Sequence, residues 1–158
     1  IGIPNLFELQ LGYTLQSSLY DQPFEWAENS DLPAQRKMFR TPDSYGYFTS
    51  TWNIAPRFRA SLFGTYTGTM LVQHTFYNAQ TDSMQDAETL TPDFFDMGLK
   101  LAYTFRLSTS VNLELSAGVK NIFNSYQKDL DFGPLKDAGY VYGPALPRMF
   151  FAGLKLTM

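Results

Sequence analysis

Apolar and polar residues alternate one by one over long stretches of this chain. From residue 95 to residue 107, every second side chain is apolar and those between are polar or small. A strand with apolar surroundings on one side and polar surroundings on the other shows this period of two. The phase of one stretch stays open, because Tyr45 and Tyr47 compete with Phe48 and Trp52 for its apolar side. In all, the pattern predicts six strands, over residues 6–20, 44–54, 59–72, 94–107, 111–124 and 148–158.

Charged residues respect this alternation. Nine charges, eight inside the five well-phased stretches and Arg57 at the entry to the third predicted strand, fall in the polar phase: Glu8, Arg57, Arg59, Asp96, Lys100, Arg106, Glu114, Lys120 and Lys155. The opposite phase therefore behaves as if charge were costly there. On the lipid face of a membrane barrel, a lysine or arginine at the midplane costs about 2 to 4 kcal/mol. The stretches also reach the roughly 9 to 11 residues that a tilted strand needs to cross a bilayer.

The connections between these strands alternate in length. Residues 53–58 and 108–110 are short turns, whereas residues 21–43, 73–93 and 125–147 are long, polar and without alternating runs. Outer-membrane barrels combine short periplasmic turns with long extracellular loops. The sequence thus predicts an all-β fold, an antiparallel up-and-down segment of a transmembrane β-barrel. Six strands are fewer than the about 8 that close such a barrel, so we expect further strands before this segment.

Composition and charge exclude several classes of protein. Aromatic residues make up 16% of the chain, and many lie near strand ends, as in the aromatic girdles of membrane barrels. The net charge of −3, without a lysine-arginine run, excludes the usual electrostatics of a nucleic-acid binder. The absence of cysteine excludes disulfides and thiolate zinc sites. No apolar stretch reaches the roughly 18 residues of a transmembrane helix.

Two blocks near the C-terminus, residues 117–124 and residues 142–155, resemble the last strands of TonB-dependent receptors. Residues 117–124 are similar to the end of that family's penultimate strand, which runs glycine-x-x-asparagine-leucine-phenylalanine-asparagine. The second block resembles the tyrosine, proline-arginine, aromatic and glycine signature of the final strand, in Tyr142, Gly143, Pro144, Pro147, Arg148, Phe150, Ala152, Gly153, Leu154 and Lys155. Gly153, Leu156 and Met158 resemble the barrel-assembly signal, although Met158 departs from the usual terminal phenylalanine.

The resemblance implies a larger protein. Residues 1–158 would be the C-terminal part of a 22-stranded barrel in the outer membrane of a Gram-negative bacterium. The barrel would import a scarce small-molecule or metal-chelate ligand, such as an iron-siderophore complex, haem or cobalamin. Its partners would be its own N-terminal barrel and plug domain, TonB through a segment outside this chain, membrane lipid and lipopolysaccharide. Neither enzymatic activity nor a cofactor is expected.

Candidate ligand-binding residues lie in the long connections. The single histidine, His74, stands beside aromatic residues where a haem receptor would place an axial ligand, but a lone loop histidine is more often solvated. Trp26, Tyr77, Tyr140 and Tyr142 are loop aromatics that either stack on a ligand or pack the loops together.

The long connections contain acidic residues that are candidate cation ligands. The spacing of Asp82, Asp86, Glu88, Asp93, Asp129, Asp131 and Asp137 matches no calcium loop, so we expect solvated acidic faces and no metal site. The strand carboxylates Glu8, Asp96 and Glu114 are expected to pair with neighbouring cations rather than to act as an acid and base.

Three other functions remain open from the sequence. A TonB-dependent importer of glycans would share the fold. A small complete barrel, serving as a pore or an adhesin, would need two further strands inside the connections. A soluble β-sandwich would use its aromatic rings to bind sugar or lipid, and a second layer would then cover the apolar side of these strands.

Overall fold

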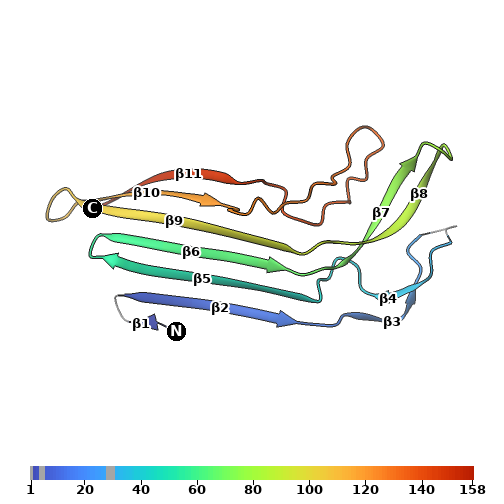
Figure 1. Ribbon diagram of the computed structural model, residues 1–158, viewed down its shortest axis with the longest axis horizontal. Coiled ribbons are helices and arrows are strands. Elements are labelled where there is room, and N and C mark those ends of the chain that lie inside the picture. The colour runs from blue at the N-terminus through green and yellow to red at the C-terminus, as the bar shows by residue number, and fades with distance from the viewer. Residues whose placement is uncertain (1, 4–5, 28–30) are drawn as a thin grey trace.

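The computed structural model describes residues 2–3, 6–27 and 31–158, and this part of the chain is all β, without a helix (Figure 1). Seven strands form one antiparallel sheet in the order β1-β2-β5-β6-β9-β10-β11. They are β1 (Gly2–Ile3), β2 (Phe7–Leu15), β5 (Ser44–Ala55), β6 (Phe58–Thr67), β9 (Phe94–Arg106), β10 (Asn112–Lys120) and β11 (Met149–Thr157). The six predicted strands are all present as the long members of this sheet. None of the described segments is a helix long and apolar enough to cross a membrane.

Two long connections are more ordered than predicted. They carry small antiparallel sheets of their own, β3 (Leu19–Phe24) with β4 (Gln35–Lys37) and β7 (Leu71–Asn78) with β8 (Ser83–Leu90). The prediction of long structureless loops is therefore wrong for these two connections, and it holds for residues 125–147, which contain no strand. The predicted strands 6–20 and 59–72 were also too long, because the chain leaves the main sheet at residues 16–18 and 68–70.

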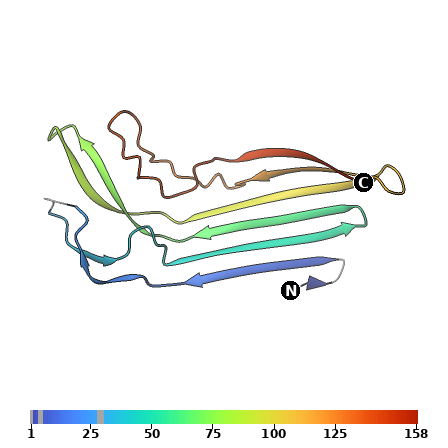
Figure 2. The same ribbon diagram turned by 180° about the vertical axis from the view of Figure 1, so that it is seen from behind.

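The two ends of the sheet differ. All three long connections lie at one end, where the β7–β8 hairpin rises from the sheet, and the short turns lie at the opposite end (Figures 1 and 2). The predicted turns are confirmed, since residues 56–57 join β5 to β6 and residues 107–111 join β9 to β10. The sheet is open, because β1 and β11 are its outer strands and do not pair with each other.

Strand pairing places all strand charges on one face, named here the charged face. Residues paired across antiparallel strands point to the same side. One such row runs from Glu8 through Thr51 and Ser61 to Lys100. Stepping along each strand by twos brings the other charges to the same face: Arg59, Asp96, Arg106, Glu114, Lys120 and Lys155. The opposite, uncharged face of the long strands carries none.

The same pairing settles the open phase of β5. Phe48 and Trp52 lie on the uncharged face, while Tyr45 and Tyr47 pair with Thr14 and Gly12 on the charged face.

In the part of the chain that the structure describes, no second layer covers the uncharged face. The extensive contacts of each long strand with other strands are those with its neighbours in the sheet, and large apolar side chains stay open, with Leu11 65%, Leu15 76%, Leu101 41% and Leu154 76% exposed. Within the described ranges, a sandwich with these leucines in its core is therefore not found. The buried apolar cluster lies instead at the loop end, where Met70, Val72 and Tyr140 pack together.

Aromatic rings fill the space above the glycines of the sheet. Five glycines lie directly opposite an aromatic residue, in the pairs Gly12–Tyr47, Gly46–Tyr13, Gly64–Phe48, Gly98–Phe63 and Gly118–Phe151. In each pair a ring atom lies within 3 Å of where a β-carbon on the glycine would stand. Cross-strand rings of this kind cover the weak points that glycines leave in a sheet. Part of the high aromatic content therefore serves the sheet itself.

Candidate functional site

The connections at one end of the sheet form a loop cluster, defined as residues 19–27, 31–43, 68–93 and 121–148. Arg40 ties three of them, since its guanidinium donates to the carbonyl oxygens of Gly139 at 2.6 Å and Val141 at 3.2 Å, and its backbone N–H donates to Leu71 at 2.8 Å. Glu88 on β8 accepts hydrogen bonds from segments on either side of residues 28–30. The donors are Trp26 Nε1 at 3.0 Å and Gln35 Nε2 at 2.6 Å.

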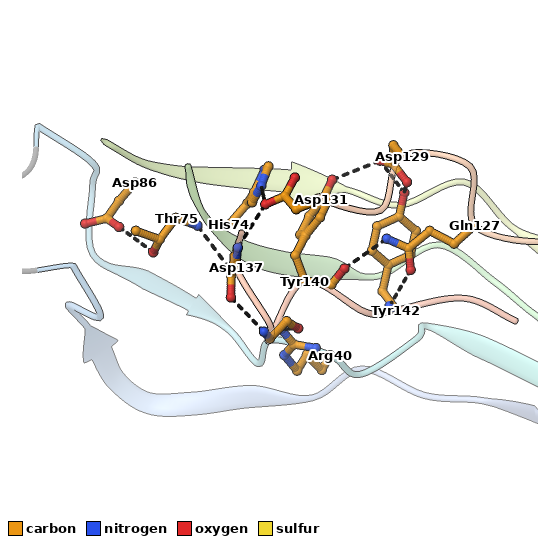
Figure 3. A network of polar contacts seen from close by, with 11 residues as sticks. Arg40, His74, Thr75, Asp86, Gln127, Asp129, Asp131, Asp137, Tyr140 and Tyr142 are labelled. Carbon is orange, nitrogen blue, oxygen red and sulfur yellow. Dashed lines mark hydrogen bonds and ion pairs between the residues drawn. The ribbon is translucent and has the colours of Figure 1, made fainter. Parts of the chain in front are cut away.

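Three of the predicted ligand-binding residues meet in this cluster as an aromatic stack of His74, Tyr140 and Tyr142 (Figure 3). The His74 ring lies on the Tyr140 ring with centroids 3.7 Å apart and planes 11° apart. Tyr142 contacts Tyr140 edge to face at 5.2 Å. His74 comes from β7 and the tyrosines from the β10–β11 connection, so the stack joins two segments distant in sequence.

A buried glutamine and a carboxylate hold the two tyrosines. Gln127 donates through Nε2 to the Tyr140 carbonyl at 3.0 Å and accepts at Oε1 from the Tyr142 N–H at 2.8 Å. Asp129 accepts hydrogen bonds from both hydroxyls, at 3.1 Å from Tyr140 and 2.6 Å from Tyr142. Desolvation works to raise the pKa of Asp129, but the bonds from Tyr142 and Tyr140 outweigh it and lower that pKa. Desolvation and the same carboxylate raise the pKa of Tyr142.

Two further carboxylates fasten this connection to β7. Asp131 Oδ2 lies 2.9 Å from His74 Nε2 and accepts the Asp137 N–H at 3.1 Å. Asp137 accepts the backbone N–H groups of Thr75 at 3.2 Å and Gly139 at 2.7 Å (Figure 3). The hydrogen bond with His74 lowers the pKa of Asp131, despite the opposing effect of desolvation. The stack is thus anchored at both ends by ionised groups.

The other two predicted residues lie apart from the stack. Trp26 packs edge to face on Phe39 at 5.9 Å and donates to Glu88. Tyr77 is exposed near the tip of the β7–β8 hairpin and donates to Asp82, a bond that raises the pKa of Tyr77.

A cavity of about 510 Å³ lies between the segment that leads into β9 and the segment that follows β10. Phe94, Phe123, Tyr126 and Tyr142 supply its aromatic walls. Its polar groups come from Asp93, Asn124, Ser125, Gln127, Lys128 and Asp129. Aromatic walls with a few convergent polar groups are typical of small-molecule sites. The cavity shares Tyr142 and Asp129 with the network described above, whereas His74 and Tyr140 do not line it.

Several residues of this site could not be recognised from the sequence. Phe94 was assigned only to a strand, although it is buried against Tyr142, with its ring against Gly143. Gln127 was not singled out, because a polar residue in an aperiodic connection gives no local sign that it is buried.

The expectation of simply solvated acidic loops is wrong for several members. Asp86 accepts the Thr75 hydroxyl at 2.7 Å, and Glu88, Asp129, Asp131 and Asp137 hold the bonds described above. Within the described residues, no group of three or more histidine or carboxylate side chains is placed to hold a metal ion.

The expected pairing of strand carboxylates is found for Glu114. Its two oxygens lie 2.7 Å from Arg59 Nη2 and 3.9 Å from Lys100 Nζ.

The residues that resemble an assembly signal lie in the outer strand β11 and directly after it. Gly153 and Leu156 belong to the outer strand β11, and Met158 follows it with 90% of its surface exposed.

Comparison with models of known protein families finds no match to this chain. Searches of curated proteins and of solved structures find none either.

Proposed function

We propose that this chain forms the C-terminal part of the wall of a TonB-dependent receptor, an importer in the bacterial outer membrane. The observation that carries the proposal is a single-layered sheet of six long strands whose charges all lie on one face. In water the other face would leave a large apolar surface exposed, which soluble monomers avoid. Hydrocarbon on that side removes the problem, and a water-filled interior suits the charged face.

Strand length and sheet edges support the same environment. The six long strands run 9 to 13 residues, enough for a tilted crossing of a bilayer. The unpaired outer edge of β11 would expose a row of backbone groups, a liability that closure into a barrel abolishes. In the proposed receptor, strands from the rest of the protein supply the closure.

The two blocks that resemble TonB-dependent receptors are bonded to each other. Asn121 and Asn124 both adopt left-handed backbone conformations, with φ of 52° and 56°, at the end of the first block. Asn121 Nδ2 donates to the carbonyl oxygens of Ser125 and Leu146, each at 3.0 Å. Asn124 Oδ1 accepts the N–H of Arg148, in the second block, at 2.9 Å. These bonds close the base of the β10–β11 connection, which favours treating the two blocks as one structural unit.

The loop cluster supplies the ligand-capturing part of the proposal. Its own apolar core and its hydrogen-bonded carboxylates hold aromatic side chains in fixed places before any ligand arrives, which reduces the ordering cost of binding. The cavity between Phe94 and Tyr126 offers room for part of an iron chelate, haem or cobalamin.

A matched pair of substitutions in the full-length parent protein tests the membrane assignment. Leu101 on the uncharged face and Lys100 on the charged face are neighbours in β9. Leu101→Arg should impair outer-membrane insertion, because arginine there costs about 2 to 4 kcal/mol near the midplane, whereas Lys100→Leu should be mild. The measurement is the yield of folded, heat-modifiable protein in outer-membrane fractions. Equal yields for the two variants, or recovery of the parent protein without detergent, would contradict the assignment.

A transport measurement tests the importer itself. Uptake of the candidate cargo by cells that carry the parent protein should stop when TonB is deleted or the proton-motive force is collapsed. Binding to the cell surface should persist under both conditions. Uptake that survives de-energisation would identify a passive pore instead.

A further inference from the structure

The charged face has a strong excess of cations. Arg57 precedes β6 in the same phase, so this face and its turns carry six cations, Arg57, Arg59, Lys100, Arg106, Lys120 and Lys155, against three carboxylates, Glu8, Asp96 and Glu114. The rest of the sequence has the opposite balance, with six cations and twelve carboxylates. The near-neutral total therefore conceals two regions of opposite sign.

Five of these cations lie in the half of the face near the short turns, and the sixth, Lys120, ends β10 at the loop end. Glu114 stands among them, ion-paired with Arg59 at 2.7 Å and approached by Lys100 at 3.9 Å. On β11, Lys155 lies directly opposite Glu114. On β9, Thr104 lies opposite Glu114, and Arg106 follows two residues later on the same face. One carboxylate therefore serves several positive groups.

Three cations in this half lack a close ion pair. Among the described residues, Arg57, Arg106 and Lys155 form no ion pair within 4 Å. Like charges concentrated on one surface repel each other and favour a partner that carries the opposite charge.

A polar recess in this region has the form of a carboxylate site. Its volume is about 140 Å³, and its polar lining comes from Asn53, Arg57, Arg59, Thr104 and Glu114, beside apolar residues that include Pro56 and Phe58. Arginine presents a planar fork of donors that matches a carboxylate in two parallel bonds. The recess holds two such guanidinium groups, those of Arg57 and Arg59. Because Glu114 already lies between Arg59 and Lys100, Arg57 is left to bind a second carboxylate from outside.

From this placement we infer that the half of the charged face near the short turns binds an acidic surface of a folded protein domain. The complementary charge selects the occupant, and lipid is assigned to the opposite face. The inference rests on the proposed function, in which the plug domain of the same receptor lies against this face. It adds that the plug surface meeting Arg57, Lys100 and Lys155 is rich in aspartate or glutamate.

Zero-length coupling with a carbodiimide tests the inference on the full-length receptor in detergent. This reagent joins a lysine amine only to a carboxylate in direct contact with it. We expect peptides that link Lys100 or Lys155 to acidic residues outside residues 1–158. The yield should fall several-fold in 1 M sodium chloride added before coupling, where the Debye length is about 3 Å.

Matched variants complete the experiment. Lys155→Arg should abolish coupling at that position and leave the protease resistance of the docked domain unchanged, because the charge is kept. Lys155→Glu should both abolish coupling and make the domain more sensitive to protease. Cross-links that join these lysines only to Glu114, or the absence of any cross-link, would overturn the inference. They would leave the proposed function intact if Leu101→Arg and Lys100→Leu still differ in membrane insertion.

Discussion

The aromatic stack makes a quantitative prediction about the order of the β10–β11 connection. His74→Ala removes a ring stacked at 3.7 Å on Tyr140 and a hydrogen bond of 2.9 Å to Asp131. Stacked aromatic pairs contribute about 0.5 to 1.5 kcal/mol, and a hydrogen bond to a charged group about 1.5 to 3 kcal/mol. We therefore expect the docked connection to lose roughly 2 to 4 kcal/mol relative to its opened state.

This loss corresponds to a rise of about 30- to 700-fold in the population of the opened connection, at tenfold per 1.4 kcal/mol. Hydrogen exchange measures it, because the Tyr142 N–H is held by Gln127 at 2.8 Å and exchanges when the connection opens. The experiment uses the full-length protein in detergent, and the Tyr142 amide should exchange faster by the same factor.

Two intermediate variants separate the contributions. His74→Phe keeps a ring on Tyr140 and loses the bond to Asp131, whereas His74→Asn keeps a donor and loses the stack. Each should show part of the effect. Tyr77→Phe is the control, since its hydroxyl bonds only within the β7–β8 hairpin. Unchanged exchange at Tyr142 in His74→Ala would refute the argument that the stack holds the connection.

Three further predictions follow from other contacts. Gly98→Ala places a β-carbon within 2.5 Å of the Phe63 ring and should destabilise the sheet by about 1 to 3 kcal/mol, which in the proposed receptor lowers the temperature of heat modification. Arg40→Met removes two bonds to residues 139–141 and should speed proteolysis of the β10–β11 connection without affecting membrane insertion. Hydrogen bonds lower the pKa of both Asp129 and Asp131. The stability that these two carboxylates give to the docked connection is therefore complete above the ordinary pKa of 3.8 and is lost as the pH falls through the lowered pKa. Exchange at Tyr142 should thus be steady from pH 7 to about pH 5, after correction for the intrinsic rate, and accelerate below about pH 4.

The strands were predictable because their signal is local. The two-residue period alone places Leu101 and Lys100 on opposite faces, and pairing then carries the pattern from strand to strand. The phase of β5 was not predictable in this way. Tyr45 and Tyr47 are as apolar as many residues on the other side, and only the register with Gly12 and Thr14 separates them.

The candidate site depends on long-range contacts instead. His74 and Asp131 are 57 positions apart and meet only because the β10–β11 connection folds back over β7. No period connects them, and neither residue carries a local sign that it meets the other. The hairpin of β7 and β8 was missed for a related reason, because both of its sides carry polar residues and its strands lack the alternation of the sheet.

The two parts of the molecule are stabilised by different means. The sheet buries little of its apolar surface against itself, so its stability depends on the medium that covers the uncharged face, on backbone pairing and on rings such as Phe63 packed over glycines. The loop cluster has a buried core around Val72 and Tyr140, and ionised carboxylates fasten it. Substitutions at Val72 should therefore disorder the cluster and spare the sheet, whereas charges at Leu101 should prevent assembly and leave the cluster without its support. In the proposed receptor, this separation would allow the ligand-capturing loops to change while the wall stays constant.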